Sequence, residues 1–507
     1  MADTFALLLK CKFQRTLMKK QEKKPGLLLS LVPVVILVVI LTVGVVIFGE
    51  DVTGGPSQIA LVTAAIVACL IGMLYLKVPW ERFADAMGDN MSKTSEAIFI
   101  LLMIGALTST WMLSGVVPTM IYYGLKLIHP SIFLLVTFVL CSIISILAGS
   151  SWTTVGTIGV AMLNAGQIVG IPTGWLAGAI ISGAYLGDKI SPLSDTTNLS
   201  ASVAGVDLYK HVRYNLITTI PATIICLIIY TLAGFLIPTS SNVDVSVQLA
   251  ALHETFNISG WLLLIPVVTI YLIFKKVPAV LTLFISAFVG AIVAFWAQPQ
   301  IIDRIVTGMG SFKEFFYTIL KMMSSEITIL TNDPLITSLA STSGMSGMVN
   351  TVWIIICVIM LGGALSASGM IQTITESMLR FMRNLVSMIT STVFTCIFCN
   401  IILADQYMAI LLPGKMFSEV YRKKGYAPEL LSRTLQDSAT VSSVMVPWNT
   451  CAVAQAGVLG VACMTWFPYA FFCFITPPIA IIIAVIGYKI RRLPVENGEP
   501  ATAISEA

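Results

Sequence analysis

Apolar runs long enough to cross a lipid bilayer, with no charged residue inside them, recur along this chain and constrain its fold more than any other feature. A helix needs about 20 residues to cross roughly 30 Å of hydrocarbon. The clearest runs are Leu27–Phe48, Ser57–Leu76, Ala97–Leu125, Ser131–Ala148, Tyr214–Ile237, Ile258–Phe274, Pro278–Trp296, Val349–Ile371, Leu385–Leu403 and Pro468–Tyr488. Only 11% of the 507 residues are charged, against about 25% in soluble domains. The sequence therefore predicts an all-α polytopic membrane protein with about eleven to thirteen transmembrane segments.

Basic residues before the first apolar run set the expected orientation. Lys and Arg side chains are frequent between Lys10 and Lys24, and the positive-inside rule keeps such a segment in the cytoplasm. The apolar run that follows is too long for a cleaved signal peptide, so we expect a retained first helix. The net charge of +4 follows from this topology and does not indicate a nucleic-acid partner.

The chain repeats the same order of features in two halves. Each half opens with two apolar runs and then has a long run with small residues, at 103–115 and at 360–369. Polar breaks follow at corresponding places in both halves, namely 148–157 and 188–198 in the first and 399–408 and 437–449 in the second. Arg380 and Arg383 place the second half in the opposite orientation. We therefore expect inverted-topology repeats with discontinuous helices, whose ion and substrate sites lie where the breaks meet.

The repeats give the expected domain boundaries. The first transmembrane repeat covers 27–237 and the second covers 257–490. Three further segments complete the chain: a basic cytoplasmic tail at 1–26, an external linker at 238–256 and a cytoplasmic tail at 491–507.

The segment Gly187–Gly205, GDKISPLSDTTNLSASVAG, is the most informative about function. It places Asp188, Lys189 and Asp195 directly after the uncharged run Leu127–Gly187, and an ionisable side chain at membrane depth costs about 2.5–3.5 kcal/mol or more. Sodium is a hard cation that binds carboxylate, hydroxyl, amide and carbonyl oxygens, and a broken helix exposes carbonyls. We therefore predict a cation site. Two carboxylates in one site repel, so Na⁺ and H⁺ can compete for the same oxygens.

Other side chains of the first half also carry oxygen atoms suited to a cation. They are Ser191, Ser194, Thr196, Thr197 and Asn198 in this segment, and Ser150, Ser151, Thr153 and Thr154 in an earlier segment that we expect to be unwound. Helix capping and hydrogen bonds back to the backbone are the ordinary alternative for all of them. The alternative for Asp188 is an ion pair with a neighbouring helix, and for Asp195 it is a helix cap. Lys189 need not neutralise Asp188, because adjacent helical residues point about 100° apart.

The second half offers two further carboxylates. Asp405 ends one uncharged run and Asp437 precedes another. The polar residues expected to support them are Thr440, Ser443 and Asn449. Arg433 lies four residues before Asp437, so an ion pair on one helix face is the main alternative for that carboxylate. Because this half has no carboxylate that matches Asp195, we place the main Na⁺ site in the first half, at Asp188, Asp195, Thr196 and Asn198.

Four motifs carry a resemblance to a known family: AGSSWTTVGTIG (148–159), GDKISPLSDTTNLSASVAGVD (187–207), LADQYM (403–408) and QDSATVSSVMVPWNT (436–450). With them the chain resembles the NhaC family of Na⁺/H⁺ antiporters over essentially its whole length apart from both tails. The resemblance implies exchange of cytoplasmic Na⁺ for external H⁺ across a bacterial inner membrane. Carried over by motif, the ion-binding set is Asp188, Ser191, Asp195, Thr196 and Asn198, with Asp405 and Asp437 as partners from the other half.

The transported substrate is less constrained than the fold. The family is also similar to a relative that exchanges malate with protons for lactate with Na⁺, so a coupled exchanger of small organic acids or amino acids is the second interpretation. In that case Arg433, or the amino ends of half-helices near Ser150 and Ser194, would meet the organic anion. A channel is disfavoured because no pore-loop filter is evident, and an enzyme because no GxSxG, HExxH or Walker-type motif occurs.

The expected partners follow from these interpretations. They are Na⁺, H⁺ and the lipid bilayer, with a small organic anion under the second interpretation. A homodimer is left open. We expect no cofactor and no nucleic acid.

Overall fold

The computed structural model describes residues 24–48, 52, 54–237, 245–305, 312–331, 337, 340–493, 495–496 and 499–500. These residues form two compact units, one drawn from 1–93 and 356–380 and the other from 94–355 and 381–507. Both units therefore draw residues from each predicted repeat. Parts of the predicted tails and of the linker, including 1–23, 238–244 and 501–507, lie outside the described residues.

The first unit contains the amino-terminal helices. Its elements are α2 (Leu27–Phe48), α3 (Pro56–Leu74), the first part of α4 (Trp80–Leu113), the last part of α18 (Val349–Ala367) and α19 (Met370–Leu379). Helix α2 packs against α3 and α19. The Lys24 ammonium lies 3.3 Å from a Glu376 carboxylate oxygen at the end of this bundle. The bounds of α2 are those of the first predicted apolar run.

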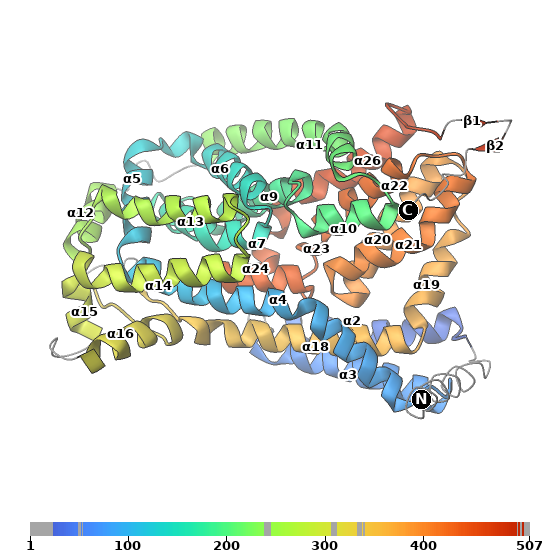
Figure 1. Cartoon of the computed structure of the whole chain (residues 1–507), viewed down its shortest axis with the longest axis horizontal. Helices are drawn as coiled ribbons and strands as arrows, with labels where there is room; N and C mark the ends of the chain where they lie inside the picture. Colours follow the sequence, from blue (N-terminus) through green and yellow to red (C-terminus); the bar gives the residue numbers. More distant parts are fainter. Residues whose placement is uncertain are drawn as a thin grey trace, which may run out of the picture. The chain divides into compact units, whose positions relative to one another are not determined.

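The second unit holds the remaining helices, which Figure 1 colours from cyan to red. Before residue 237 they are α5 (Val116–Leu127), η2 (Pro130–Ile132), α6 (Phe133–Ala148), α7 (Ser151–Thr154), η3 (Val155–Gly159), α8 (Val160–Ile168), α9 (Thr173–Ile190), α10 (Asp195–Ala204) and α11 (Leu208–Leu236). Those that follow up to η5 are α12 (Val245–Thr255), η4 (Gly260–Leu263), α13 (Leu264–Phe274), α14 (Ala279–Ala297), α15 (Pro299–Ile305), α16 (Phe312–Ser324) and η5 (Met345–Met348).

The carboxyl-terminal part of the second unit is built of long and short helices in alternation. Its elements are α20 (Leu385–Leu403), α21 (Gln406–Lys423), α22 (Pro428–Leu435), η6 (Gln436–Thr440), α23 (Val441–Ser443), α24 (Thr450–Leu459), α25 (Cys463–Trp466), η7 (Phe467–Tyr469) and α26 (Phe471–Ile486). A short antiparallel pair, β1 (Val495–Glu496) and β2 (Glu499–Pro500), follows. The turns η3 and η6 are π-helical, a geometry that is rare and often occurs at functional sites.

Eight helices among the described residues are long and apolar enough to cross a membrane, or ten if each of two bent helix pairs counts as one span. This is fewer than the eleven to thirteen segments expected. The reason is that the polar breaks divide several segments into pieces such as α7, α10, α22 and α24, each of which is too short to span a bilayer alone. The all-helical membrane fold with broken helices is confirmed.

Two runs that the sequence predicts to be continuous are broken at glycine. The run Ala97–Leu125 is divided between α4 and α5 at Gly115, where φ is +82°. The run Val349–Ile371 is divided between α18 and α19 at Gly369, where φ is +71°. These left-handed backbone positions favour glycine and end the helix before it. Hydropathy alone could not indicate the break, because glycine does not interrupt an apolar run.

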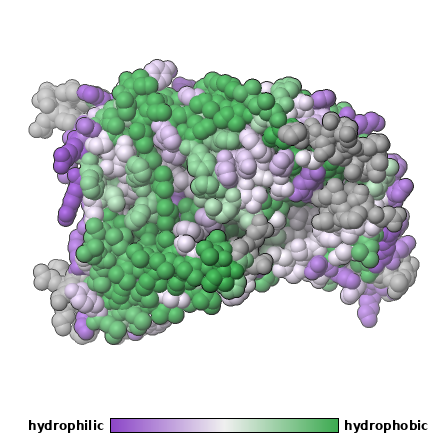
Figure 2. All heavy atoms as spheres, turned by 180° about the vertical axis from the view of Figure 1, so that it is seen from behind, coloured by the Kyte–Doolittle hydropathy of each residue, from purple (hydrophilic) through white to green (hydrophobic). Residues whose placement is uncertain are grey.

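The outward-facing side chains are mostly apolar. Val46, Phe235 and Trp296 are 80%, 66% and 72% exposed, which is unfavourable in water but suited to contact with lipid tails. Figure 2 shows hydrophobic residues over large areas of one face, with hydrophilic residues gathered toward the two ends of the view. Together with the long apolar helices, this surface fits a multi-pass membrane protein.

The first polar break has the same local geometry in both predicted halves. Helix α6 ends at Gly149 (φ +68°), and Ser150 then caps α7 by accepting from the backbone N–H of Thr153. Helix α20 ends at Ala404 (φ +51°), and Asp405 then caps α21. In each half, therefore, a left-handed residue and an N-cap side chain restart the helix.

The second polar break also matches between the halves. The half-helices α10 and α24 are each 10 residues long. Ser194 and Asn449 cap their amino ends, and Gly205 and Gly460 end them in the left-handed conformation. The contacts are reciprocal, since α10 packs against α21 and α24 packs against η3. These features support the predicted repeat, and its inverted orientation stays a prediction.

Candidate ion-binding site

The Asp188 carboxylate lies where the ends of three helical segments meet in the second unit. It projects from the last turn of α9 and is 5% exposed. One carboxylate oxygen accepts from the Ser151 hydroxyl at 2.7 Å. The other accepts from the Ser194 hydroxyl at 2.5 Å and lies 3.5 Å from the Thr196 hydroxyl. We call Asp188, Ser151, Ser194 and Thr196 the Asp188 cluster.

Close packing of α6 against α9 positions this cluster. The Ser145 hydroxyl donates to the carbonyl of Ala184 at 2.5 Å, and a Cβ atom at Gly187 would clash with Ser145. A Cβ atom at Gly149 would lie 2.6 Å from that of Leu193. Small residues are therefore required where the first break of the chain crosses the second, which brings Ser151 within reach of Asp188.

The break between α9 and α10 is held in shape by its own polar side chains. The Ser191 hydroxyl donates to the carbonyl of Ile146 at 2.7 Å. The Asn198 side-chain amide donates to the carbonyls of Pro192 and Ser194 at 3.2 and 2.8 Å. Both side chains were predicted to bind the ion, but here they satisfy backbone groups that the break exposes.

The charge of Asp188 is not balanced by a neighbouring cation, since it forms no ion pair within the described part of the chain. The predicted alternative of an ion pair with a neighbouring helix does not occur there. Its stabilisation comes instead from hydroxyl donors, and from the amino ends of the helical segments that begin at Ser151 and Asp195. A buried carboxylate with hydroxyl partners is a set of oxygens suited to a small hard cation.

A buried amide joins this cluster to the second half of the chain. Gln436 is fully buried in η6, and its side-chain NH₂ group donates to the hydroxyls of Thr196 and Thr197 at 3.2 and 3.1 Å. Its carbonyl oxygen accepts from Ser200 at 2.7 Å and from Thr440 at 3.0 Å. The amide therefore uses both donors and both lone pairs, and it fixes Thr196 beside Asp188.

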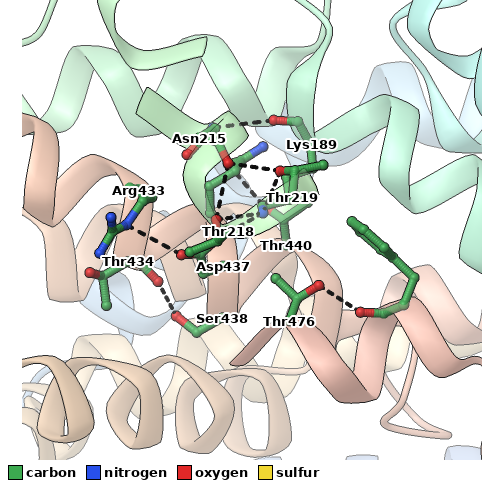
Figure 3. A network of polar contacts seen from close by, with 12 residues as sticks. Lys189, Asn215, Thr218, Thr219, Arg433, Thr434, Asp437, Ser438, Thr440 and Thr476 are labelled. Atoms are coloured by element: carbon green, nitrogen blue, oxygen red, sulfur yellow. Dashed lines mark hydrogen bonds and ion pairs between the residues drawn. The ribbon is translucent and has the colours of Figure 1, made fainter. Parts of the chain in front are cut away.

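The next residue along α9, Lys189, belongs to a separate network, which Figure 3 shows. Its ammonium lies 2.7 Å from a carboxylate oxygen of Asp437 and donates to the hydroxyls of Thr218 and Thr219 at 3.0 and 2.8 Å. Arg433 lies 3.6 Å from the other oxygen of Asp437. We call these five residues the Lys189 cluster. The prediction that Lys189 need not neutralise Asp188 is confirmed.

The two clusters are joined through the backbone. The Thr197 hydroxyl lies 2.9 Å from the carbonyl oxygen of Asp188 and 3.3 Å from that of Lys189. The Asn215 amide donates to the carbonyl of Lys189 at 3.3 Å. A movement of the end of α9 would therefore disturb both clusters together.

The structure places the other predicted carboxylates away from the Asp188 side chain. Asp195 is exposed at the first position of α10, and Ser194 rather than Asp195 is the cap of that helix. Asp405 is half-buried and caps α21 by accepting from the backbone N–H of Met408 at 2.8 Å. Asp437 belongs to the Lys189 cluster, and the predicted ion pair with Arg433 is present beside a second, closer one with Lys189.

Most of the predicted supporting side chains hold the local backbone. Thr153 bonds to Ser150, and Thr154 bonds back to the carbonyl of Ser150. These residues were expected to be unwound, but Ser151–Thr154 is a helical turn, because the capping side chain of Ser150 lets the helix restart at once. In the second half, Ser443 donates to the carbonyl of Thr440, and Asn449 caps α24.

Sequence reasoning missed Gln436 and the hydroxyl pair Thr218 and Thr219. Gln436 stood directly before a predicted carboxylate, in the quoted motif QDSATVSS, and its position there was the available signal. The threonine pair lies in an otherwise apolar run, in NLITTIP, and such polar atoms in a span require partners. Neither signal indicates which distant residue is the partner.

Comparisons with known proteins agree with this architecture. The model of the "Na+/H+ antiporter family" matches residues 18–214 and 183–488. The "Na(+)/H(+) antiporter NhaC" of Alkalihalophilus pseudofirmus is 35% identical over 435 residues, which are 86% of this chain and 91% of that protein. The "Malate-2H(+)/Na(+)-lactate antiporter" of Bacillus subtilis is 36% identical over 85% of this chain and 90% of that protein. The "Arginine/ornithine antiporter ArcD" of Halobacterium salinarum is 31% identical over 96% and 97%.

Proposed function

Because the chain belongs to the Na⁺/H⁺ antiporter family, we propose that it exports Na⁺ in exchange for H⁺ by alternating access across a bacterial inner membrane. One observation carries the proposal above the others. Asp188 is a buried carboxylate without a cationic partner in the described residues, and it is surrounded by hydroxyl groups at a helix break.

This arrangement suits reversible binding of Na⁺. The hydroxyls of Ser151 and Ser194 now donate to Asp188, but a hydroxyl rotates freely enough to offer a lone pair instead. When Na⁺ enters, the carboxylate and the turned hydroxyls supply its oxygen ligands. When Na⁺ leaves, the hydroxyls return to the carboxylate and limit the cost of the buried charge.

The predicted role of Thr196 is kept in this proposal, since its hydroxyl lies 3.5 Å from Asp188. Asp195 is proposed as an exposed carboxylate that attracts cations toward the break, because it lies at the start of α10, next to the cap of that helix. Asp405 and Asp437 are proposed as partners from the other half that shape the surroundings of the site without binding the ion themselves.

The test is Na⁺-driven proton movement in proteoliposomes that contain only this protein. With an internal pH dye and an imposed ΔpH, we expect Na⁺ alone to dissipate the gradient. The measurement is repeated with malate, lactate and neutral amino acids. Dissipation that occurs only when one of these is present would overturn the simple cation exchange.

A second candidate function is Na⁺/H⁺-coupled exchange of a small organic anion. The observation that favours it is Arg433, which is fully buried and whose guanidinium nitrogens make no hydrogen bond within the described part of the chain. Such a group attracts a carboxylate. The same proteoliposome experiment separates the two functions, and replacing Arg433 by Gln should weaken transport only if an organic acid is the substrate.

A further inference from the structure

Three buried charges meet in the Lys189 cluster, and they do not balance. Lys189, Arg433 and Asp437 are each fully buried. Two of them are cations and one is a carboxylate, so the cluster carries one excess positive charge when all three are ionised. An excess charge in a low-dielectric interior is costly unless it is removed or compensated.

Only one of these three side chains can remove the excess by releasing a proton. Arginine stays protonated in proteins, whereas a lysine in a buried site can become neutral. Release from Lys189 leaves Arg433 and Asp437, a pair of opposite charges 3.6 Å apart. The carboxylate therefore has a cationic partner in both protonation states of Lys189.

The contacts of Lys189 suit both states as well. Three acceptors surround the ammonium, namely Asp437, Thr218 and Thr219, which satisfies its three donors. After release of a proton, the neutral amine still has two donors and gains one lone pair, and either threonine hydroxyl can turn to donate to it. Neither state leaves the amine nitrogen without a partner.

The position of Lys189 couples it to the proposed Na⁺ site. It follows Asp188 directly in the last turn of α9, and the carboxyl end of a helix favours any positive charge placed there. Na⁺ at Asp188 and the proton on Lys189 both use this stabilisation, and they repel each other. The Thr197 hydroxyl, which lies within hydrogen-bonding distance of both carbonyls, holds the two positions together.

We propose that Lys189 carries the exchanged proton, with Asp437 and Arg433 as its fixed counter-charges, while Asp188 binds Na⁺. The inference rests on the proposed Na⁺/H⁺ exchange and deepens it. Binding of one Na⁺ to the Asp188 carboxylate accompanies release of one proton from the Lys189 ammonium to water. The summed charge of the two side chains and the ion is then the same before and after the step.

Other groups that face Lys189 do not offer a better proton carrier. His211 of α11 lies within electrostatic reach, but its two ring nitrogens are held by Ser432 and Asn215 at 2.8 and 3.0 Å. From α26, the ring of Phe472 lies 5.8 Å from the ammonium. The remaining titratable side chains on elements packed against α9 are Cys141 of α6, Tyr230 of α11, Asp195 of α10, Cys463 of α25, Tyr469 of η7 and Cys473 of α26. None of these forms an ion pair with Lys189 in the described residues.

The experiment compares two transport measurements on the full chain in proteoliposomes. Counterflow of ²²Na⁺ at equal pH on both sides needs only the Na⁺ site. Na⁺-driven proton movement needs both ions. The variants are Lys189→Arg, which keeps the charge but cannot release the proton, and Lys189→His, which releases it at lower pH. The matched control is Lys210→Arg, an exposed lysine of α11.

We expect Lys189→Arg to keep counterflow within about threefold of the control and to lose at least about tenfold of Na⁺-driven proton movement, because its guanidinium stays protonated. Lys189→His should keep proton movement, with an optimum at least about 2 pH units more acidic, since histidine titrates far below lysine.

The outcomes separate this inference from the function on which it rests. Absence of Na⁺-driven proton movement in the unchanged protein would refute the exchange itself. Normal exchange in the unchanged protein, with wild-type proton movement and pH profile in Lys189→Arg, would refute only the role of Lys189 and leave the proton with Asp188. Loss of counterflow in both Lys189 variants would assign the residue a structural role and overturn the proposal.

Discussion

Asp188 and Lys189 are neighbours in sequence, yet they lie in two clusters with opposite electrostatic character. The Asp188 cluster has a carboxylate and only hydroxyl partners. The Lys189 cluster has a carboxylate with two cations, and its closest contact is an ion pair of 2.7 Å. The first arrangement lacks a positive charge and the second has one too many. The difference teaches that a single helix end can present a cation-binding and a cation-releasing group in opposite directions.

The largest effect is expected from Asp188→Asn. The amide keeps the shape and can still bond to Ser151 and Ser194, whose hydroxyls rotate. Without the negative charge, however, Na⁺ loses its main ligand. We expect ²²Na⁺ counterflow to fall at least about 100-fold while the purified protein keeps its thermal unfolding temperature within a few degrees, because no buried partner is left unsatisfied.

Asp188→Glu is the matched control for this prediction. It keeps the charge and displaces it by one methylene group, so partial counterflow should remain. Wild-type transport in Asp188→Asn would remove this carboxylate from the mechanism.

The next largest effect is expected from Asp437→Asn, which acts on the other cluster. This change leaves Lys189 and Arg433 buried without an anionic partner, and breaking a buried ion pair in this way costs about 3–5 kcal/mol. We expect a marked loss of thermal stability in detergent, measured by unfolding of the purified protein. Asp188→Asn should not show this loss, which is the contrast between the clusters.

A double variant sharpens the interpretation of Asp437. Adding Arg433→Leu to Asp437→Asn removes one of the two unpaired cations, so part of the lost stability should return. The two changes would then be strongly non-additive, as expected for side chains in contact. Simple additivity would show that the charges of Arg433 and Asp437 do not interact.

A smaller effect is expected from Gln436→Leu. This change removes the amide that holds Thr196 and Thr197 and leaves the hydroxyls of Ser200 and Thr440 without their acceptor. The Asp188 carboxylate itself is untouched. We expect the apparent Na⁺ affinity to weaken about tenfold, with little change in the maximal rate, because Thr196 is no longer fixed beside the site. An unchanged affinity would limit Gln436 to helix packing.

How much of this could be predicted from sequence depended on whether the information was local. The bounds of α2 and α20 coincide with uncharged runs in the sequence, because the bilayer imposes one length and one composition on a span. The helix breaks were also found, because serine, asparagine and proline act on their own neighbours in the chain. Asp188 could be singled out because it directly follows a long uncharged run.

The partners of these residues could not be predicted, because they are distant in sequence. Nothing in the pattern indicates that Lys189 meets Asp437, or that Gln436 bonds to Thr196. The same reason explains Asn198 and Ser191, whose oxygen-bearing side chains suggested ion ligands. In the folded chain their nearest unsatisfied groups are backbone atoms of the break, and these compete successfully for the side chains.

The smallest effect is expected from Asp195→Asn, and it tests whether the contrast between the clusters extends to their surroundings. Asp195 is exposed and touches neither cluster through a printed side-chain bond in Figure 3 or around Asp188. Its charge nevertheless lies at the amino end of α10, close in sequence to Ser194, where it can raise the local concentration of cations. We expect the apparent Na⁺ affinity to weaken by no more than about threefold, and this difference should shrink at high ionic strength because salt screens an exposed charge. A loss as large as that of Asp188→Asn would instead make Asp195 a direct ligand in a conformation of the break other than the one described here.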